Sequence, residues 1–247
     1  MRDIKDYQEK YKEEPFEQYQ AFFRRKKVLE LLDEYPHRNV LEVGCGLNPL
    51  FTDISEFETM TVIEPAEDFI RIAKEKAADR EEVYCIHGLL EEKIEEIQRL
   101  KIKFDYIVVS GLLHEVESPE ILLKSLCMLC SKDTVVHINV PNALSFHRII
   151  AFEMGEIESI YQRSDMQDLL QQKQRTYDKN SIDKTVEKAG FKIIEKGTYF
   201  PKFLTHMQLQ KVIDAGVIDT KILNGIYGLG KYVPEYGSEL YVQLKLA

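Results

Sequence analysis

The sequence predicts an α/β protein built around a doubly wound parallel sheet. Short apolar runs alternate with longer amphipathic segments up to about residue 140, and the first apolar run leads directly into a glycine-rich turn. Unbroken apolar runs are typical of strands that are buried on both faces, and parallel strands of this kind are joined by crossover helices. The order of the segments therefore indicates the fold class.

The expected elements follow one another regularly. Buried strands are predicted at residues 39–45, 59–64, 82–87, 104–110 and 135–140. Amphipathic helices are predicted between them at residues 65–78, 90–100 and 119–129. Connections of this length suit helices that cross from one parallel strand to the next.

The N-terminal segment stands outside this alternation. Residues 1–36 are predicted to be helical, with Pro15 dividing the segment and Pro36 ending it. We expect this leader to act as a lid. Residues 37–247 are expected to form one domain, because the chain is long enough for a single large core.

The alternation ends after Pro141. Residues 145–180 have no strand pattern, and they are expected to form either a helical cap inserted over the site or a simple surface helix. A helix capped by Ser181 and stopped by Gly190 should follow. Two further strands are expected, at residues 191–199 and 239–246.

The turn after the first strand is the most informative motif. Gly44, Cys45 and Gly46 form a Gly-x-Gly turn, and the second strand ends in Glu64, about twenty residues later. An acid at this place can bind ribose hydroxyls beside a glycine turn. The pattern predicts a nucleotide-like cofactor.

The turn also discriminates between cofactors. A dinucleotide fold needs a further glycine where this chain has Pro49, because a helix N-terminus receives the pyrophosphate there. Glu42, two residues before the first glycine, suits the positive end of a ligand better than a phosphate. A sulfonium with an amino-acid tail fits that charge.

These residues resemble the first two motifs of the class I S-adenosylmethionine-dependent methyltransferases, acid-x-Gly-x-Gly-x-Gly and an acid ending the second strand. The matching residues are Glu42, Gly44, Cys45, Gly46 and Glu64. Asn48 replaces the usual third glycine, and asparagine tolerates left-handed backbone better than most residues. The resemblance implies S-adenosylmethionine as the cofactor, with its ribose bound at Glu64 and Pro65. It also implies a Rossmann-like, seven-stranded sheet of order 3-2-1-4-5-7-6 with an antiparallel closing strand.

Further loops should complete the cofactor site, because ligands of open α/β sheets bind at the carboxyl ends of the strands. The resemblance places the adenine ring after the third strand, where Leu89 replaces a common acid. The amide of Leu90 and ring stacking would then carry more of the recognition, or Glu91 would reach in. Ser110 ends the fourth strand and is expected to line the site. Tyr11 and the other aromatic residues of the leader should close over the cofactor.

His114 and His147 are the candidate catalytic bases. The ordinary pKa of histidine, near 6.5, lies close to working pH, so either side chain can accept a proton from a hydroxyl. The alternative for His114 is that it only lines the cofactor pocket, because alignment alone often drives methyl transfer.

The turn after the fifth strand carries the candidate acceptor-binding residues. Asn142, Ser145 and His147 can hydrogen-bond hydroxyl groups, and Arg148 can bind a phosphate or carboxylate with its planar fork. A helix-capping turn with solvated side chains is the alternative. The expected reaction is methylation of an oxygen or nitrogen of a small polar acceptor, anionic or carbohydrate-linked.

Composition limits the possible partners. The net charge of −9 opposes binding of nucleic acid, and the basic run at residues 24–27 is expected to be the solvated face of a helix. No segment reaches the roughly 20 apolar residues of a membrane span, so we expect no membrane association. The start of the chain lacks a signal peptide, so a cytoplasmic monomer or homodimer is expected. The scattered cysteines and histidines predict reduced thiols and no metal site.

Two alternative functions stay open at this level. One is methylation of a protein or RNA, which would need a basic groove around the cleft. The other is a regulatory protein that binds S-adenosylmethionine without turnover, which a closed acceptor side or a cleft without a base would favour.

Overall fold

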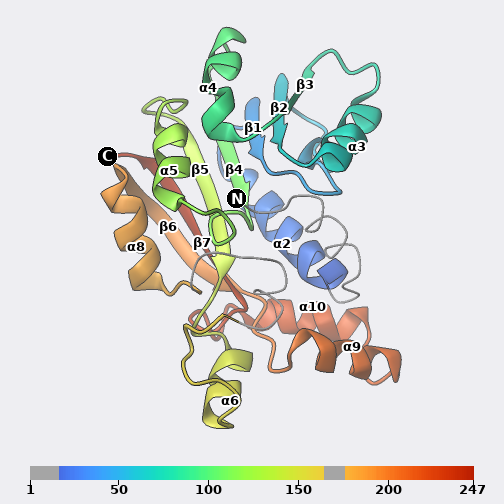
Figure 1. Cartoon of the computed structure of the whole chain (residues 1–247). Coiled ribbons are helices and arrows are strands. Elements are labelled where there is room, and N and C mark those ends of the chain that lie inside the picture. Colours follow the sequence, from blue (N-terminus) through green and yellow to red (C-terminus); the bar gives the residue numbers. More distant parts are fainter. Residues whose placement is uncertain (1–16, 164–175) are drawn as a thin grey trace.

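A computed structural model describes residues 17–163 and 176–247. Within them, one seven-stranded sheet has the order β3-β2-β1-β4-β5-β7-β6 (Figure 1). The strands are β1 (Asn39–Val43), β2 (Thr59–Glu64), β3 (Val83–His87), β4 (Tyr106–Ser110), β5 (Val135–Pro141), β6 (Phe191–Tyr199) and β7 (Glu239–Leu246). The first five strands are parallel, and β7 is antiparallel to both β5 and β6. The predicted fold class and strand order are confirmed.

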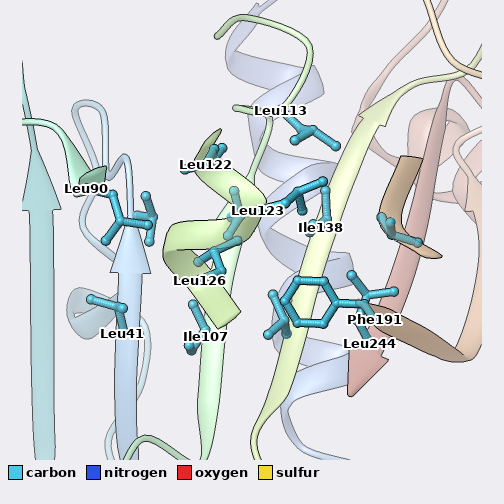
Figure 2. Packing of buried hydrophobic residues seen from close by; sticks show 14 of the residues in the cluster. Leu41, Leu90, Ile107, Leu113, Leu122, Leu123, Leu126, Ile138, Phe191 and Leu244 are labelled. Carbon is cyan, nitrogen blue, oxygen red and sulfur yellow. The ribbon is translucent and has the colours of Figure 1, made fainter. Parts of the chain in front are cut away.

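Helices cover both faces of the sheet. They are α2 (Glu17–Leu32), α3 (Glu67–Ala77), α4 (Leu90–Arg99), α5 (Pro119–Cys127), α6 (Phe146–Glu153), α8 (Lys179–Lys188), α9 (His206–Asp214) and α10 (Thr220–Leu229), with a 3-10 turn η1 (Leu50–Thr52). On one face, α4, α5 and α8 pack on the sheet, as Figure 2 shows for Leu122, Leu123 and Leu126 of α5. On the other face lie α2 and α3.

The two hydrophobic cores arise because side chains alternate between the two faces of the sheet along each strand. In β1, Leu41 packs under α4 and α5, whereas its neighbour Val40 packs under α2 and α3. Successive strand residues point to opposite faces, so a strand that is apolar throughout fills both cores. Burying a leucine or valine side chain contributes about 1.5 to 3 kcal/mol.

Several expected boundaries need correction. The first strand ends at Val43, because Gly44 takes a left-handed φ of 80°. The cap of α8 is Asp178 and not Ser181: the Asp178 carboxylate accepts from the Ser181 amide, and the Ser181 hydroxyl accepts from the Asp178 amide. As expected, Gly190 follows the helix in a left-handed conformation.

No element was predicted between β6 and β7, where the structure has α9 and α10. These helices form a third apolar cluster with Phe23 of α2 and with Phe200. Phe23 and Phe200 stack with their ring centroids 4.3 Å apart. Helix α2 is therefore joined to the C-terminal part of the chain by packing that no local pattern indicates.

The expected lid and cap are described only in part. Within the leader, α2 ends at Leu32, before Pro36, whereas Pro15 and Tyr11 lie outside the described residues. Within the expected insertion, α6 is described, and residues 164–175 are not. The roles of these segments as lid and cap stay predictions.

Candidate functional site

A cleft of about 1280 Å³ opens at the carboxyl ends of β1, β2, β4 and β5. Pockets for one drug-sized ligand are typically about 300 to 1,000 Å³, so this cleft has room for a cofactor and a second molecule. It includes nearly all the residues that the sequence assigns to the cofactor: Glu42, Gly44, Cys45, Gly46, Glu64, Pro65, Leu89, Leu90 and Ser110. The fold thus brings the separate loops together; Tyr11 lies outside the described residues.

The glycine turn depends on two left-handed residues. Gly44 has φ 80° and donates its amide to the Ile63 carbonyl at 2.8 Å, which ties the turn to the end of β2. Gly46 has φ 55°, and a Cβ there would meet nothing within 4 Å. Asn48 does not share this conformation. Its carbonyl accepts from Arg25 and its side chain from Lys76, so it is held by contacts and not by left-handed backbone.

Glu42 is buried beneath this turn. Its Oε2 accepts from the Leu50 amide at 2.8 Å, and Arg25 Nη2 lies 3.5 Å from its Oε1. Burial raises the pKa of Glu42 to about 7, against the opposing effect of Arg25. The carboxylate therefore holds the start of η1 and would be stabilised as an anion by a cationic ligand.

Glu64 ends β2 and is also buried. One oxygen accepts from the Ala66 amide at 2.9 Å and the other from the Gly46 amide at 3.2 Å. Burial raises the pKa of this carboxyl, and these amide bonds work in the opposite direction. The group is thus fixed between the two cofactor loops, where ribose hydroxyls can donate to it.

The arginines of α2 correct the expectation of a solvated basic face. The side chains of Arg24 and Arg25 are only 19% and 23% exposed, and both line the cleft. Arg25 joins Glu42 to the Asn48 carbonyl, as described above. Arg24 forms an ion pair with Glu239 at the start of β7, with Nη2 2.6 Å from Oε1. The spacing of the basic run gave no indication of these two buried acids.

Glu239 is the centre of a buried polar network that the sequence does not reveal. It accepts from Gln20 at 2.9 Å, from Asn139 at 2.6 Å and from the Tyr199 hydroxyl. Although burial opposes ionisation, Arg24, Tyr199 and Gln20 lower the pKa of Glu239 to about 2. Helix α2 and strands β5 and β6 are therefore all attached to Glu239 of β7 at the edge of the cleft.

His114 lies in the cleft as expected. Its ring is buried, with Nε2 3.9 Å from Glu115 Oε1, in the loop that begins at the left-handed Gly111. A Cβ at Gly111 would lie 3.5 Å from the Arg24 guanidinium. The loop therefore passes closely between the cofactor turn and α2, which agrees with either assigned role of His114.

The side chains of the turn after β5 make contacts other than those expected from the sequence. Both amide hydrogens of Asn142 are used, by the carbonyls of Glu235 at 3.0 Å and Gly237 at 2.9 Å. Ser145 is fully buried and is not among the residues that line the cleft. Arg148 lines the cleft, but Nε donates to the Ile160 carbonyl at 2.9 Å and Nη2 to that of Gln162. The side chains of Asn142 and Arg148 thus stabilise this part of the backbone.

His147 does lie in the cleft, beside two basic residues that sequence reasoning missed. Lys202, in the loop before α9, and His206, the first residue of α9, line the same end. Burial lowers the pKa of both histidines well below 6.5, and the neighbouring charge of Lys202 adds to this. His147 and His206 are therefore neutral at pH 7 and can accept a proton.

The fold and the site together define a class I S-adenosylmethionine-dependent methyltransferase. Residues 7–196 match the family model described as a methyltransferase domain, so the chain belongs to this family. S-adenosylmethionine, expected from the glycine turn, is the cofactor of the family. Glu42, Glu64 and the left-handed glycines fit it, because they offer two buried carboxylates and an unobstructed backbone turn.

Solved structures show the same fold at low sequence identity. The plantazolicin methyltransferase BamL, solved with a desmethyl analogue of plantazolicin and S-adenosylhomocysteine, is 13% identical, with a TM-score of 0.60 over 93% of this chain and 87% of that one. A methyltransferase from Mesorhizobium loti is 13% identical, with a TM-score of 0.59 over 87% and 95%. The N-methyltransferase NodS from Bradyrhizobium japonicum is 11% identical, with a TM-score of 0.54 over 95% and 89%. No curated protein matches the chain.

Residues 17–163 and 176–247 contain no helix that is both long and apolar enough to cross a bilayer. They also contain no group of three or more side chains placed to bind a metal ion.

Proposed function

We propose that this protein transfers the methyl group of S-adenosylmethionine to an oxygen or nitrogen of a small, polar, anionic acceptor. The observation that carries the proposal is the division of one cleft into two ends. The first end holds the glycine turn and the buried carboxylates Glu42 and Glu64, and the second holds His147 beside Lys202. A donor and an acceptor can thus be bound in one cavity.

When bound, the cofactor supplies an electrophilic methyl group on a sulfonium. Glu64 would accept bonds from the ribose hydroxyls, and Glu42 would balance the positive charge. Residues at the second end of the cleft would hold the acceptor atom facing the methyl group, so that the methyl could pass to it from sulfur. The chain's main contribution to this step is alignment.

The proton of a hydroxyl acceptor needs a base, and His147 is one candidate for it. It is neutral at pH 7 because its pKa is lowered by burial first and then by the Lys202 charge. Its Nδ1 is buried and has no hydrogen-bond partner among the described residues, so this atom can receive the proton. His114 stays the alternative base, on the cofactor side of the cleft.

The test is formation of S-adenosylhomocysteine from S-adenosylmethionine with a panel of phosphorylated and nucleotide-linked metabolites. With a hydroxyl acceptor, loss of the general base should reduce kcat about 100- to 10,000-fold, in His147→Ala or in His114→Ala. Lys221→Gln, on the exposed side of α10, is the matched control and should keep full activity. Normal turnover in both histidine variants would show that no base is needed. No turnover with any small acceptor would contradict the proposal.

A further inference from the structure

The loop that follows the glycine turn is held by cations from two helices. Asn48 stands where the resemblance places a third glycine, and its backbone is not left-handed. Arg25 of α2 donates to the Asn48 carbonyl through Nη2. Lys76 of α3 donates from Nζ to the Leu47 carbonyl at 3.0 Å and to Asn48 Oδ1 at 3.1 Å. Side-chain donors thus fix a loop whose shape a glycine would otherwise set.

Arg25 is the more buried of these two cations. Its side chain is 23% exposed, whereas Lys76 is an exposed residue. Besides the Asn48 carbonyl, its guanidinium contacts two acids: Nη2 lies 3.5 Å from Glu42 Oε1, and Nε lies 3.6 Å from Asp53 Oδ2. One planar group therefore joins β1, the loop and the residue that ends η1. The fixed fork of a guanidinium suits several contacts at once, whereas a lysine ammonium is a single point charge.

The charge of Glu42 depends on Arg25. Burial raises the pKa of Glu42 to about 7, Arg25 opposes this rise, and the neighbouring Glu64 of β2 adds to it. Among the described residues, the thiols of Cys45 in the turn and Cys85 in β3 also face Glu42. Burial raises the pKa of both thiols, so they stay neutral. Arg25 therefore supplies the positive charge that favours the anionic form of Glu42 near pH 7.

Building on the role of Glu42 in the proposed function, we propose that Arg25 is a positioning residue for S-adenosylmethionine, because it joins Glu42 to the loop of residues 47–53. Two effects come from this one side chain. Its charge keeps Glu42 ionised, and its fork keeps the loop in one conformation before the cofactor binds. A loop that is already ordered loses less conformational entropy on binding.

The first test measures the affinity of the full-length protein for S-adenosylhomocysteine by calorimetry at pH 7 and pH 8.5. Without Arg25, the pKa of Glu42 should rise by about one pH unit or more, since an opposite charge nearby shifts a carboxyl by that amount. A protonated Glu42 no longer attracts a cation. Arg25→Gln should therefore lose about 4-fold more affinity at pH 7 than at pH 8.5, each compared with the unaltered protein at the same pH.

Two further variants accompany this measurement. Arg25→Lys keeps the positive charge, so its affinity relative to the unaltered protein should differ little between the two pH values. Arg99→Gln, in an ion pair with Glu95 whose side chains are 75% and 87% exposed, is the matched control. It should bind S-adenosylhomocysteine like the unaltered protein at both pH values.

The second test separates the fork from the charge by hydrogen exchange without ligand. The Leu50 amide donates to Glu42 Oε2 and the Asp53 amide to the Leu50 carbonyl, so both amides report on the loop. Arg25→Gln and Arg25→Lys should each exchange them about 10-fold faster or more, because both variants lose bonds made by a charged fork. The amides of β5 should exchange alike in all the proteins, which shows that the variants are folded.

The outcomes distinguish this role of Arg25 from the proposed function. A loss of affinity in Arg25→Gln that is equal at the two pH values would show that Arg25 does not act through Glu42. Unchanged exchange of the loop would show that Arg25 does not hold it, and either result overturns the proposal. If Arg25→Gln does not fold, the exchange of the loop in Arg25→Lys decides. If the unaltered protein does not bind S-adenosylhomocysteine, the methyltransferase function fails, and the exchange result alone decides on Arg25.

Discussion

At the scale of single residues, burial decides what the acids of the cleft do. Glu42 and Glu64 are buried with raised pKa values, whereas Glu239 is as deeply buried with a lowered one. The difference lies in their partners, because Glu239 has Arg24 and three further side-chain donors while Glu64 is held by backbone amides. The first two are therefore ready for a ligand that donates to them, and Glu239 is already satisfied.

Glu64→Ala should weaken binding of S-adenosylhomocysteine by roughly 2 to 4 kcal/mol, because ribose hydroxyls lose a charged acceptor. Titration calorimetry measures this. Glu75→Ala, on the exposed side of α3, is the matched control and should leave the affinity unchanged. An unchanged affinity in the Glu64→Ala variant would remove Glu64 from the ribose site.

His137 should make stability depend on pH. Burial lowers its pKa to about 4, whereas the unfolded value is about 6.5. Below pH 6.5 the His137 ring binds a proton in the unfolded chain but not in the folded protein. The contribution of His137 to the free energy of unfolding is therefore fully present above pH 6.5. It is lost, by about 3 kcal/mol in total, as the pH falls from 6.5 through 4. Urea unfolding between pH 7 and 4 should show a smaller decrease for His137→Gln; equal decreases would refute the assignment.

At the scale of elements, α2 connects the two ends of the cleft. Arg25 contacts the cofactor turn, Arg24 contacts the start of β7, and Phe23 packs against Phe200. Three successive side chains of one helix thus fix three separate segments. The helix is part of the site and is not only a cover for the sheet.

Glu239→Gln should lower the free energy of unfolding by roughly 3 kcal/mol, because it removes the charge of Glu239 from its largely buried ion pair with Arg24. Denaturant titration measures the change. Glu75→Gln breaks the exposed pair with Arg71, whose side chains are 58% and 62% exposed, and should have no measurable effect. Similar losses in the two variants would show that the buried network does not stabilise the attachment of α2.

At the scale of the whole molecule, the cleft is lined by loops that follow different strands, so binding of the cofactor there should be coupled to global stability. S-adenosylhomocysteine at 100 times its Kd should raise the free energy of unfolding by about 2.7 kcal/mol. NAD at the same concentration should have no effect, because Pro49 occupies the place of the glycine that a dinucleotide needs. Equal stabilisation by NAD would contradict the choice of cofactor.

The sequence by itself determined the sheet, its strand order through the family resemblance, and the cofactor turn. These depend on local signals: apolar runs of strand length, glycines at left-handed positions, and an acid at a fixed distance from them. Gly44, Gly46 and Glu64 therefore occupy the expected places.

Only the tertiary structure decided the second end of the cleft, around His147. Lys202, His206 and Glu239 lie far from His147 or Arg24 in sequence, and each is ordinary in its local context. Packing of α9 and α10 against α2 brings them together, and burial then sets their pKa values. For the same reason the local pattern could not show that Asn142 and Arg148, which it offered as ligands, also donate to backbone carbonyls: these contacts use both amide hydrogens of Asn142 and two nitrogens of Arg148.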